Sequence, residues 1–274
     1  MICRTDLALE SISGVENFSR GWEQQERGNY FQIHEIRIQN AEAEEIFGKP
    51  KGNYITLEGE SLSGFSGHYP EMAEEFATEL RKLLPERGLV FVAGLGNQNI
   101  TPDSLGVRTA EKIIATRHLK QELTQEDENF LKNLRPVSVL AGGVLGQTGI
   151  ETAELIQAVC EKIQPSAVIA VDALACTAPE RLGRTIQIAD TGISPGSGVS
   201  NHRKALNQET LGIPVIGIGV PTVINMQYLS EHAPNMTVSP RDIDRLIQQA
   251  SHLLGCGINM ALQPDMSYQD IANF

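Results

Sequence analysis

The sequence predicts an α/β fold with three layers, in which helices flank a mostly parallel sheet and an antiparallel strand unit lies near the N-terminus. Two observations carry this prediction. Three short stretches, 89–93, 167–171 and 214–220, contain only apolar residues, Gly and Pro, which is typical of strands covered on both faces. Helix-like stretches lie between them, and such alternation predicts right-handed crossovers between parallel strands.

The N-terminal part has a different pattern. The first thirty residues are polar with few apolar pairs, so we expect residues 1–30 to form a loosely held arm. Phe31–Gln39 alternates apolar and polar residues, which indicates a half-buried strand, and Asn53–Glu58 is a second candidate. These two strands would pair as the antiparallel unit. Residues 31–274 are expected to form a single domain.

The remaining elements follow from apolar spacing and length. Four stretches place apolar residues on one helical face and predict helices: 71–84, 105–118, 151–163 and 241–255. Five short stretches predict strands: 89–93, 137–141, 167–171, 184–188 and 214–220. In this architecture, ligands gather where loops leave the carboxyl ends of the strands.

Composition excludes several classes of function. The chain has 274 residues and a net charge of −12, and an acidic surface repels phosphate, which argues against direct nucleic-acid binding. No apolar run approaches the roughly 20 residues that span a bilayer, and no signal-peptide pattern opens the chain. The four cysteines lie far apart without a CxxC pair, which favours a reducing, cytoplasmic compartment.

The loop after the first buried strand carries one candidate acid. It begins Gly94-Leu95-Gly96-Asn97 and reaches Thr101-Pro102-Asp103. The glycines permit a tight turn, but a dinucleotide fingerprint would need a further glycine at position 99, which is Asn. Asp103 stands where the next helix should begin, so an N-cap is the alternative interpretation.

A second candidate acid follows the run 167–171. Asp172 comes directly after five apolar residues, so we expect its carboxyl group to emerge from a desolvated sheet edge, where ionisation is disfavoured. The alternative is a buried structural Asp held by loop amides.

If the two strands are neighbours, Asp103 and Asp172 could share a site. Two close carboxyl groups cannot both ionise easily, so one can activate water while the other protonates a leaving group. The same pair could instead hold a divalent metal with His118 or His202 as a third ligand. Neither histidine has a ligand motif around it.

A third loop, 189–204, is rich in Gly, Ser and Thr. It could line a cleft and donate backbone N–H groups to an extended peptide or an oxyanion. The alternative is a long surface loop without such a role. Ser197 lies in Gly196-Ser197-Gly198, which does not match the G-x-S-x-G elbow of serine hydrolases.

Segments over most of the chain together resemble the germination protease (spore protease) family of endospore-forming bacteria, and they run in family order. The matching segments are Arg4–Glu10, Lys51–Glu58, Gly94–Gly106, Arg135–Thr152, Val171–Ala175, Thr185–Gly198 and Leu211–Val223.

The resemblance implies a peptidase of the spore core that degrades the small acid-soluble proteins coating spore DNA. We expect no cofactor and no bound metal. The family is described as an atypical aspartic peptidase, and its two proposed catalytic acids fall on Asp103 and Asp172. Its fold is similar to that of hydrogenase-maturation proteases, whose Gly-x-Gly-Asn loop resembles Gly94–Asn97. The substrate-binding candidates are Gly94, Asn97, Asp190, Ser194, Gly196 and Ser197.

The resemblance also implies a tetrameric zymogen that removes its own N-terminus. The spore-protein cleavage site reads Thr-Glu, an apolar residue, then Ala-Ser-Glu, and the segment from Thr5 to Glu10 (TDLALE) is similar to it. Self-cleavage is therefore expected between Asp6 and Leu7. The alternative is that this segment is simply the first ordered strand or helix start. Between Thr222 and Val238 the chain is shorter than many family members.

Two other functions stay open. One is a metal-dependent hydrolase that uses the same acids. The other is a non-catalytic module that docks a peptide at the sheet edge. The expected partners are small acid-soluble spore proteins as substrates and further copies of the chain, without nucleic acid or membrane.

Overall fold

The computed structural model describes residues 5–12, 21–64, 66–121, 134–194, 204–230 and 232–273. Within them, the strands are Trp22–Arg27 (β1), Gln32–Ile38 (β2), Gly52–Glu58 (β3), Val90–Gly94 (β4), Val137–Ala141 (β5), Ala167–Cys176 (β6), Thr185–Ala189 (β7), Val215–Asn225 (β8) and Thr237–Val238 (β9). They form one mixed sheet in the order β1-β2-β3-β7-β8-β6-β4-β5, with β9 paired to β8.

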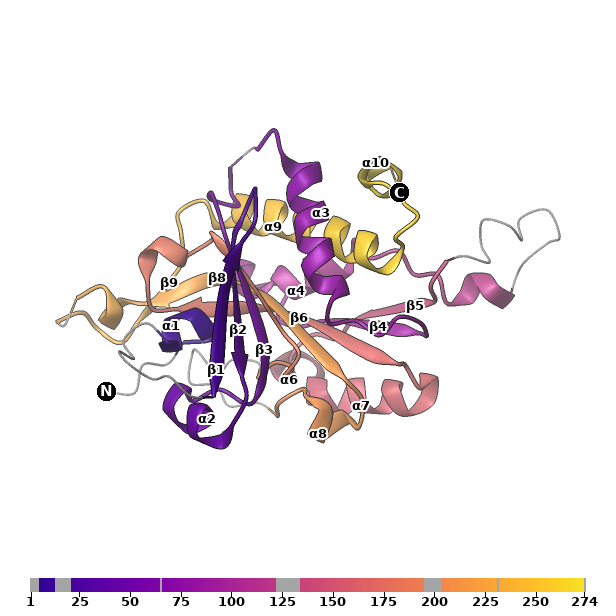
Figure 1. The fold of residues 1–274 in the computed structure, drawn as a ribbon, viewed down its shortest axis with the longest axis horizontal. Helices are drawn as coiled ribbons and strands as arrows, with labels where there is room; N and C mark the ends of the chain where they lie inside the picture. Colours follow the sequence, from indigo (N-terminus) through magenta and orange to yellow (C-terminus); the bar gives the residue numbers. More distant parts are fainter. Residues whose placement is uncertain are drawn as a thin grey trace.

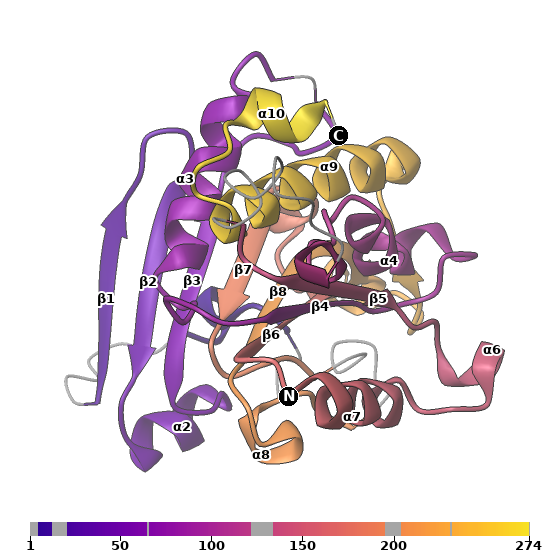
Figure 2. The same ribbon diagram turned by 90° about the vertical axis from the view of Figure 1, so that its right-hand side faces the viewer.

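The parallel part of the sheet consists of β8, β6, β4 and β5. Every residue of β4 is buried, as its uniformly apolar sequence predicts for a strand covered on both faces. Figures 1 and 2 show helices above and below this part of the sheet. The predicted layered α/β fold is confirmed.

The antiparallel part consists of β1, β2, β3 and β7. The expected pairing of Phe31–Gln39 with Asn53–Glu58 is confirmed, because β2 and β3 lie within these ranges and pair antiparallel. The antiparallel part is larger than the predicted unit, since β7 also runs antiparallel to β8 and joins the two halves of the sheet.

Helices cover both faces of the sheet. The described α-helices are Ala8–Ile12 (α1), Ala41–Phe47 (α2), Tyr69–Arg81 (α3), Leu105–Ala110 (α4), Leu145–Thr148 (α6), Thr152–Ile163 (α7), Gln208–Leu211 (α8), Ile243–Leu262 (α9) and Tyr268–Ala272 (α10). Helices α3, α4, α9 and α10 lie on one face, and α2, α7 and α8 lie on the other (Figure 2). Side chains of the sheet fill the core between these layers.

Several elements end later or earlier than predicted. β6 continues to Cys176 instead of ending at Val171, and α9 continues to Leu262. α4 ends at Ala110, because α9 holds the following chain in a turn. The side chain of Asn259 accepts from the Ile114 N–H at 3.0 Å and donates to the Lys112 carbonyl at 2.8 Å.

The expectation of a loosely held arm over residues 1–30 is wrong for its described parts. Leu7 is 0% exposed, and Trp22–Arg27 forms the edge strand β1. The sequence of β1 is polar apart from Trp22, which suits an edge strand that must not attract other chains, but leaves no apolar alternation to predict it from.

No helix among the described residues has the length and apolarity needed to cross a membrane.

Candidate active site

The loop after β4 is folded around Asp103. The Asn97 N–H donates to both the backbone carbonyl and the Oδ2 atom of Asp103, each at 3.0 Å. Gly96 has φ +103°, and a Cβ atom there would lie 1.9 Å from the Asp103 carbonyl oxygen, so this close approach requires glycine. The N-cap of α4 is Ser104 instead of Asp103, and the N-cap interpretation of Asp103 is therefore wrong.

Asp103 lies in a short 3-10 helix, Thr101–Asp103, that packs against β6, β8 and α9. Thr222 is 0% exposed and is the extra residue at an irregularity in the pairing of β8 with β6. Its hydroxyl donates to the carbonyl oxygen of Pro102 at 2.7 Å. β8 therefore holds this 3-10 helix in place through Thr222.

Asp172 lies inside β6 and not in the loop that the sequence suggested. It is 4% exposed, in agreement with the expected desolvated setting, and its Oδ1 atom accepts from the Ala173 N–H at 2.9 Å. The last pair between β4 and β6 joins Gly94 to Val171. Asp172 is thus the first residue of β6 beyond the end of β4, and it is still paired with Gly219 of β8.

We call the β4-facing side of residues Asp172–Cys176 the β6 edge. The Leu95 N–H donates to the Val171 carbonyl at 2.8 Å, which shows that the backbone groups of Val171 point toward the β4 side of the strand. Alternate residues of a strand direct their backbone groups to the same side, so Ala173 and Ala175 face that side too. Because Asp172 accepts the Ala173 N–H, its carboxylate lies at the β6 edge.

The predicted cleavage segment lies along the same edge. Asp6 N–H donates to the Ala175 carbonyl at 3.2 Å, and the Ala175 N–H donates to the Asp6 carboxylate at 2.8 Å. Leu7 is buried in a cluster with Leu174 and Ile224. The predicted scissile bond, Asp6–Leu7, therefore lies alongside β6, the strand that carries Asp172.

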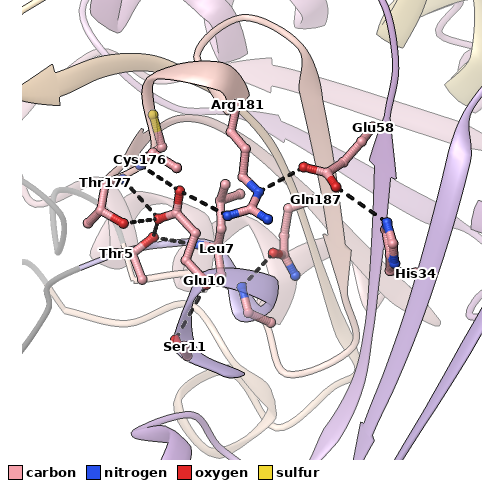
Figure 3. Close-up of polar contacts among 12 residues, drawn as sticks. Thr5, Leu7, Glu10, Ser11, His34, Glu58, Cys176, Thr177, Arg181 and Gln187 are labelled. Carbon is pink, nitrogen blue, oxygen red and sulfur yellow. Dashed lines mark hydrogen bonds and ion pairs between the residues drawn. The ribbon is translucent and has the colours of Figure 1, made fainter. Parts of the chain in front are cut away.

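Glu10 anchors this N-terminal segment (residues 5–12), a role that the sequence did not indicate. Its carboxylate accepts from the Thr177 N–H at 2.9 Å, the Thr177 hydroxyl at 2.7 Å and the Ala178 N–H at 3.0 Å. The Thr5 hydroxyl also donates to it, and Arg181 lies 3.7 Å away. Figure 3 shows Thr5, Thr177 and Arg181 around the Glu10 carboxylate.

Arg181 extends the network into the antiparallel part of the sheet. Its Nε atom donates to Glu58 at 2.8 Å, and Glu58 lies 3.3 Å from Nε2 of the buried His34 (Figure 3). Only the arrangement in space reveals this network, because its members come from α1, β2, β3 and the segment after β6.

Asp190 is placed away from the two acids. β7 runs antiparallel to β8 and pairs Ala189 with Gly217, so it carries Asp190 toward the opposite end of the sheet. The Asp190 carboxylate accepts from the Asn53 N–H at 2.8 Å and from the Asn53 side-chain amide. In this structure Asp190 fastens β3 to β7, and it is not brought together with Asp103 and Asp172 as a substrate-binding group.

The other substrate-binding candidates divide into three groups. Gly94 and Asn97 belong to the Asp103 loop, and Asn97 Oδ1 accepts from the Gln147 side chain at 2.6 Å. Ser194 is exposed and follows Ile193, which packs against the cluster that contains Leu7. Gly196 and Ser197 lie outside the described residues.

The described residues contain no group of three or more His, Cys, Asp or Glu side chains placed to hold a metal; His118 is among them, whereas His202 lies outside. Burial raises the pKa of the Cys176 thiol to about 12, which opposes its use as a nucleophile because the thiolate is the reactive form.

Comparison with known proteins agrees with the family resemblance. A family model described as germination protease matches residues 9–233. The germination protease of Clostridium tetani is 38% identical over 324 aligned positions, which cover 100% of this chain and 99% of that protein. The germination protease of Bacillus pumilus is 44% identical over 242 positions, covering 81% of this chain and 63% of that one.

Solved structures were compared as well, and a similar one can be described. It is the NiFe hydrogenase maturation protease HycI from Thermococcus kodakarensis, with a TM-score of 0.39 and 20% identity over 66% of this chain and 98% of that chain. The family model and the curated relatives cover most or all of the chain. The chain therefore belongs to the germination protease family and is a peptidase.

Proposed function

We propose that the chain is an endopeptidase that degrades small acid-soluble spore proteins in the spore core at germination, and that it is made as a self-processing zymogen. The observation that carries this proposal is the position of the N-terminal segment. Asp6 pairs with Ala175 on the β6 edge, three residues beyond Asp172, so the TDLALE sequence lies beside one candidate catalytic acid.

In the proposed reaction, Asp103 and Asp172 act as an aspartic-peptidase pair. One carboxylate takes a proton from water as the water oxygen adds to the carbonyl carbon of the scissile bond. The C–N bond then breaks, its electron pair goes to the leaving nitrogen, and the other carboxyl group supplies the proton. For Asp6–Leu7 the products are a main-chain α-carboxylate on Asp6 and an α-amino group on Leu7.

The β6 edge also suggests how an unfolded substrate binds. An extended peptide can add to an exposed strand edge through main-chain hydrogen bonds, and Asp6 makes such a bond to Ala175. While Asp6 stays there it occupies the position that a substrate strand would take. Cleavage after Asp6 releases this residue and frees Ala175, which gives a physical reason for a zymogen.

The test is incubation of the protein with a purified small acid-soluble spore protein, followed by mass spectrometry of the products. We expect fragments that end in the first Glu of a Thr-Glu-Ile-Ala-Ser-Glu site. The yield should be equal in the presence of a strong chelator. Stable association without fragments would favour the peptide-binding module. Loss of all cleavage with chelator would favour the metal-dependent hydrolase. Sedimentation of the intact protein tests the proposed tetramer.

A further inference from the structure

A lysine side chain approaches the predicted scissile bond from the side of α2. The Lys49 ammonium donates to the carbonyl oxygen of Asp6 at 3.0 Å and to that of Thr5 at 3.0 Å. The Asp6 carbonyl is the one that water would attack in cleavage of Asp6–Leu7. No sequence motif marks Lys49, which lies 43 positions away along the chain.

The local fold positions Lys49 firmly. α2 ends in a left-handed Gly48 with φ 61°, a common way to terminate a helix, and Lys49 follows at once. The next residue, Pro50, accepts a hydrogen bond from the Tyr54 hydroxyl at 2.7 Å. Phe47 is buried in the cluster that also holds Ala8 and Leu9, so α2 and the N-terminal segment share one core.

The positive charge of Lys49 can act on the Asp6 carbonyl oxygen. Burial lowers the pKa of its ammonium, and the nearby Asp6 and Glu10 carboxylates oppose that shift. An ammonium that is partly removed from water acts strongly on a charge that develops beside it. When water adds to a peptide carbonyl, the oxygen becomes an oxyanion, and a donor already aimed at it stabilises the transition state.

We propose that Lys49 is a catalytic residue for self-cleavage, whose ammonium stabilises the oxyanion that forms on the Asp6 carbonyl. This inference rests on the proposed self-processing. It adds a component that Asp103 and Asp172 do not supply, since these acids move protons whereas Lys49 accommodates the negative charge.

The N-terminal segment does not depend on Lys49 alone for its position. Glu10 holds it through Thr177 and Ala178, Leu7 is buried, and the Gln187 side chain accepts from the Ala8 N–H at 2.9 Å. Removal of the Lys49 charge should therefore slow the chemistry while the N-terminal segment stays docked. A lysine that only positioned the segment would release it when substituted.

The experiment follows the loss of residues 1–6 by intact mass over time at mildly acidic pH, with full-length protein throughout. We expect Lys49→Met to process about 100-fold more slowly or worse, and Lys49→Arg to recover part of the rate, because it keeps a charged donor. Lys51→Met is the matched control, since Lys51 is exposed two residues away, and it should process at the wild-type rate.

Two further readouts make the result decisive. The first readout is hydrogen exchange at residues 7–11, which should be as slow in Lys49→Met as in wild type. The second readout is cleavage of a Thr-Glu-Ile-Ala-Ser-Glu peptide, which is added to each sample. Wild-type processing in Lys49→Met, or fast exchange in it, would overturn the catalytic assignment and leave the proposed function intact. A wild type that cuts the peptide but keeps residues 1–6 would overturn self-cleavage and this inference together. A wild type that cuts neither would overturn the proposed function itself.

Discussion

Asp6 and Ala175 are joined by two hydrogen bonds of opposite direction. The Asp6 N–H donates to the Ala175 carbonyl, and the Ala175 N–H donates to the Asp6 carboxylate. A residue near the N-terminus is thereby attached to the strand that carries Asp172. This pairing shows how the segment that the proposed self-cleavage would cut lies docked on the strand.

The first prediction concerns Glu10, whose carboxylate is buried and accepts several hydrogen bonds. Glu10→Gln removes the charge that faces Arg181 and cannot accept all of these bonds, so it should lower the free energy of unfolding by about 2 kcal/mol. For a chain of this size that is a fall in Tm of about 5 °C. Thermal unfolding measures it, with the exposed Glu45→Gln as control. Equal melting of both variants would argue against the anchoring role.

The second prediction concerns the turn that holds Asp103. Gly96→Ala places a methyl group 1.9 Å from the Asp103 carbonyl, at a φ of +103°, so the loop must move and Asp103 with it. We expect peptide cleavage to fall at least tenfold, because small displacements of a reacting group are costly. Gly146→Ala is the control, since its Cβ would meet nothing within 4 Å. Unchanged activity in Gly96→Ala would show that the position of this loop does not matter.

The third prediction concerns acid stability and Glu79. Burial would raise the pKa of Glu79, but hydrogen bonds from Arg27 and Lys82 outweigh this effect and lower the pKa from its ordinary value. A carboxyl group with a lowered folded-state pKa stabilises the fold above its unfolded pKa, and the effect is lost as the pH falls through the folded value. Stability should therefore decline below about pH 4.3, the pKa of an unperturbed Glu, and it should decline less steeply in Glu79→Gln. Denaturant unfolding from pH 3 to 7 measures it; parallel curves would exclude Glu79 as a source of the decline.

Much of the fold was predictable because the covered strands are continuously apolar. The exception at β6 is instructive. Asp172 interrupts the apolar run and indicated a loop, but its carboxylate is satisfied by the neighbouring Ala173 N–H, and the strand continues. The direction of β7 could not be predicted either, since a short apolar strand has the same pattern whether it runs parallel or antiparallel.

The two acids stood out in the sequence because each follows a buried strand. Lys49, Glu10 and Arg181 did not, since their roles arise from contacts between segments that are distant along the chain. Asp190 is a different case. Its loop is rich in small polar residues, but the antiparallel course of β7 directs its carboxylate to Asn53.

The most direct test of the two-acid hydrolysis is the rate at which folded variants cleave a Thr-Glu-Ile-Ala-Ser-Glu peptide. Asp103→Asn and Asp172→Asn keep the shape of the side chain and remove its ability to exchange a proton, and Asp265→Asn alters an exposed acid as the control. We predict that both site variants lose cleavage by at least 100-fold, with wild-type melting temperatures, while the control stays fully active. Full activity in either folded site variant would contradict the account.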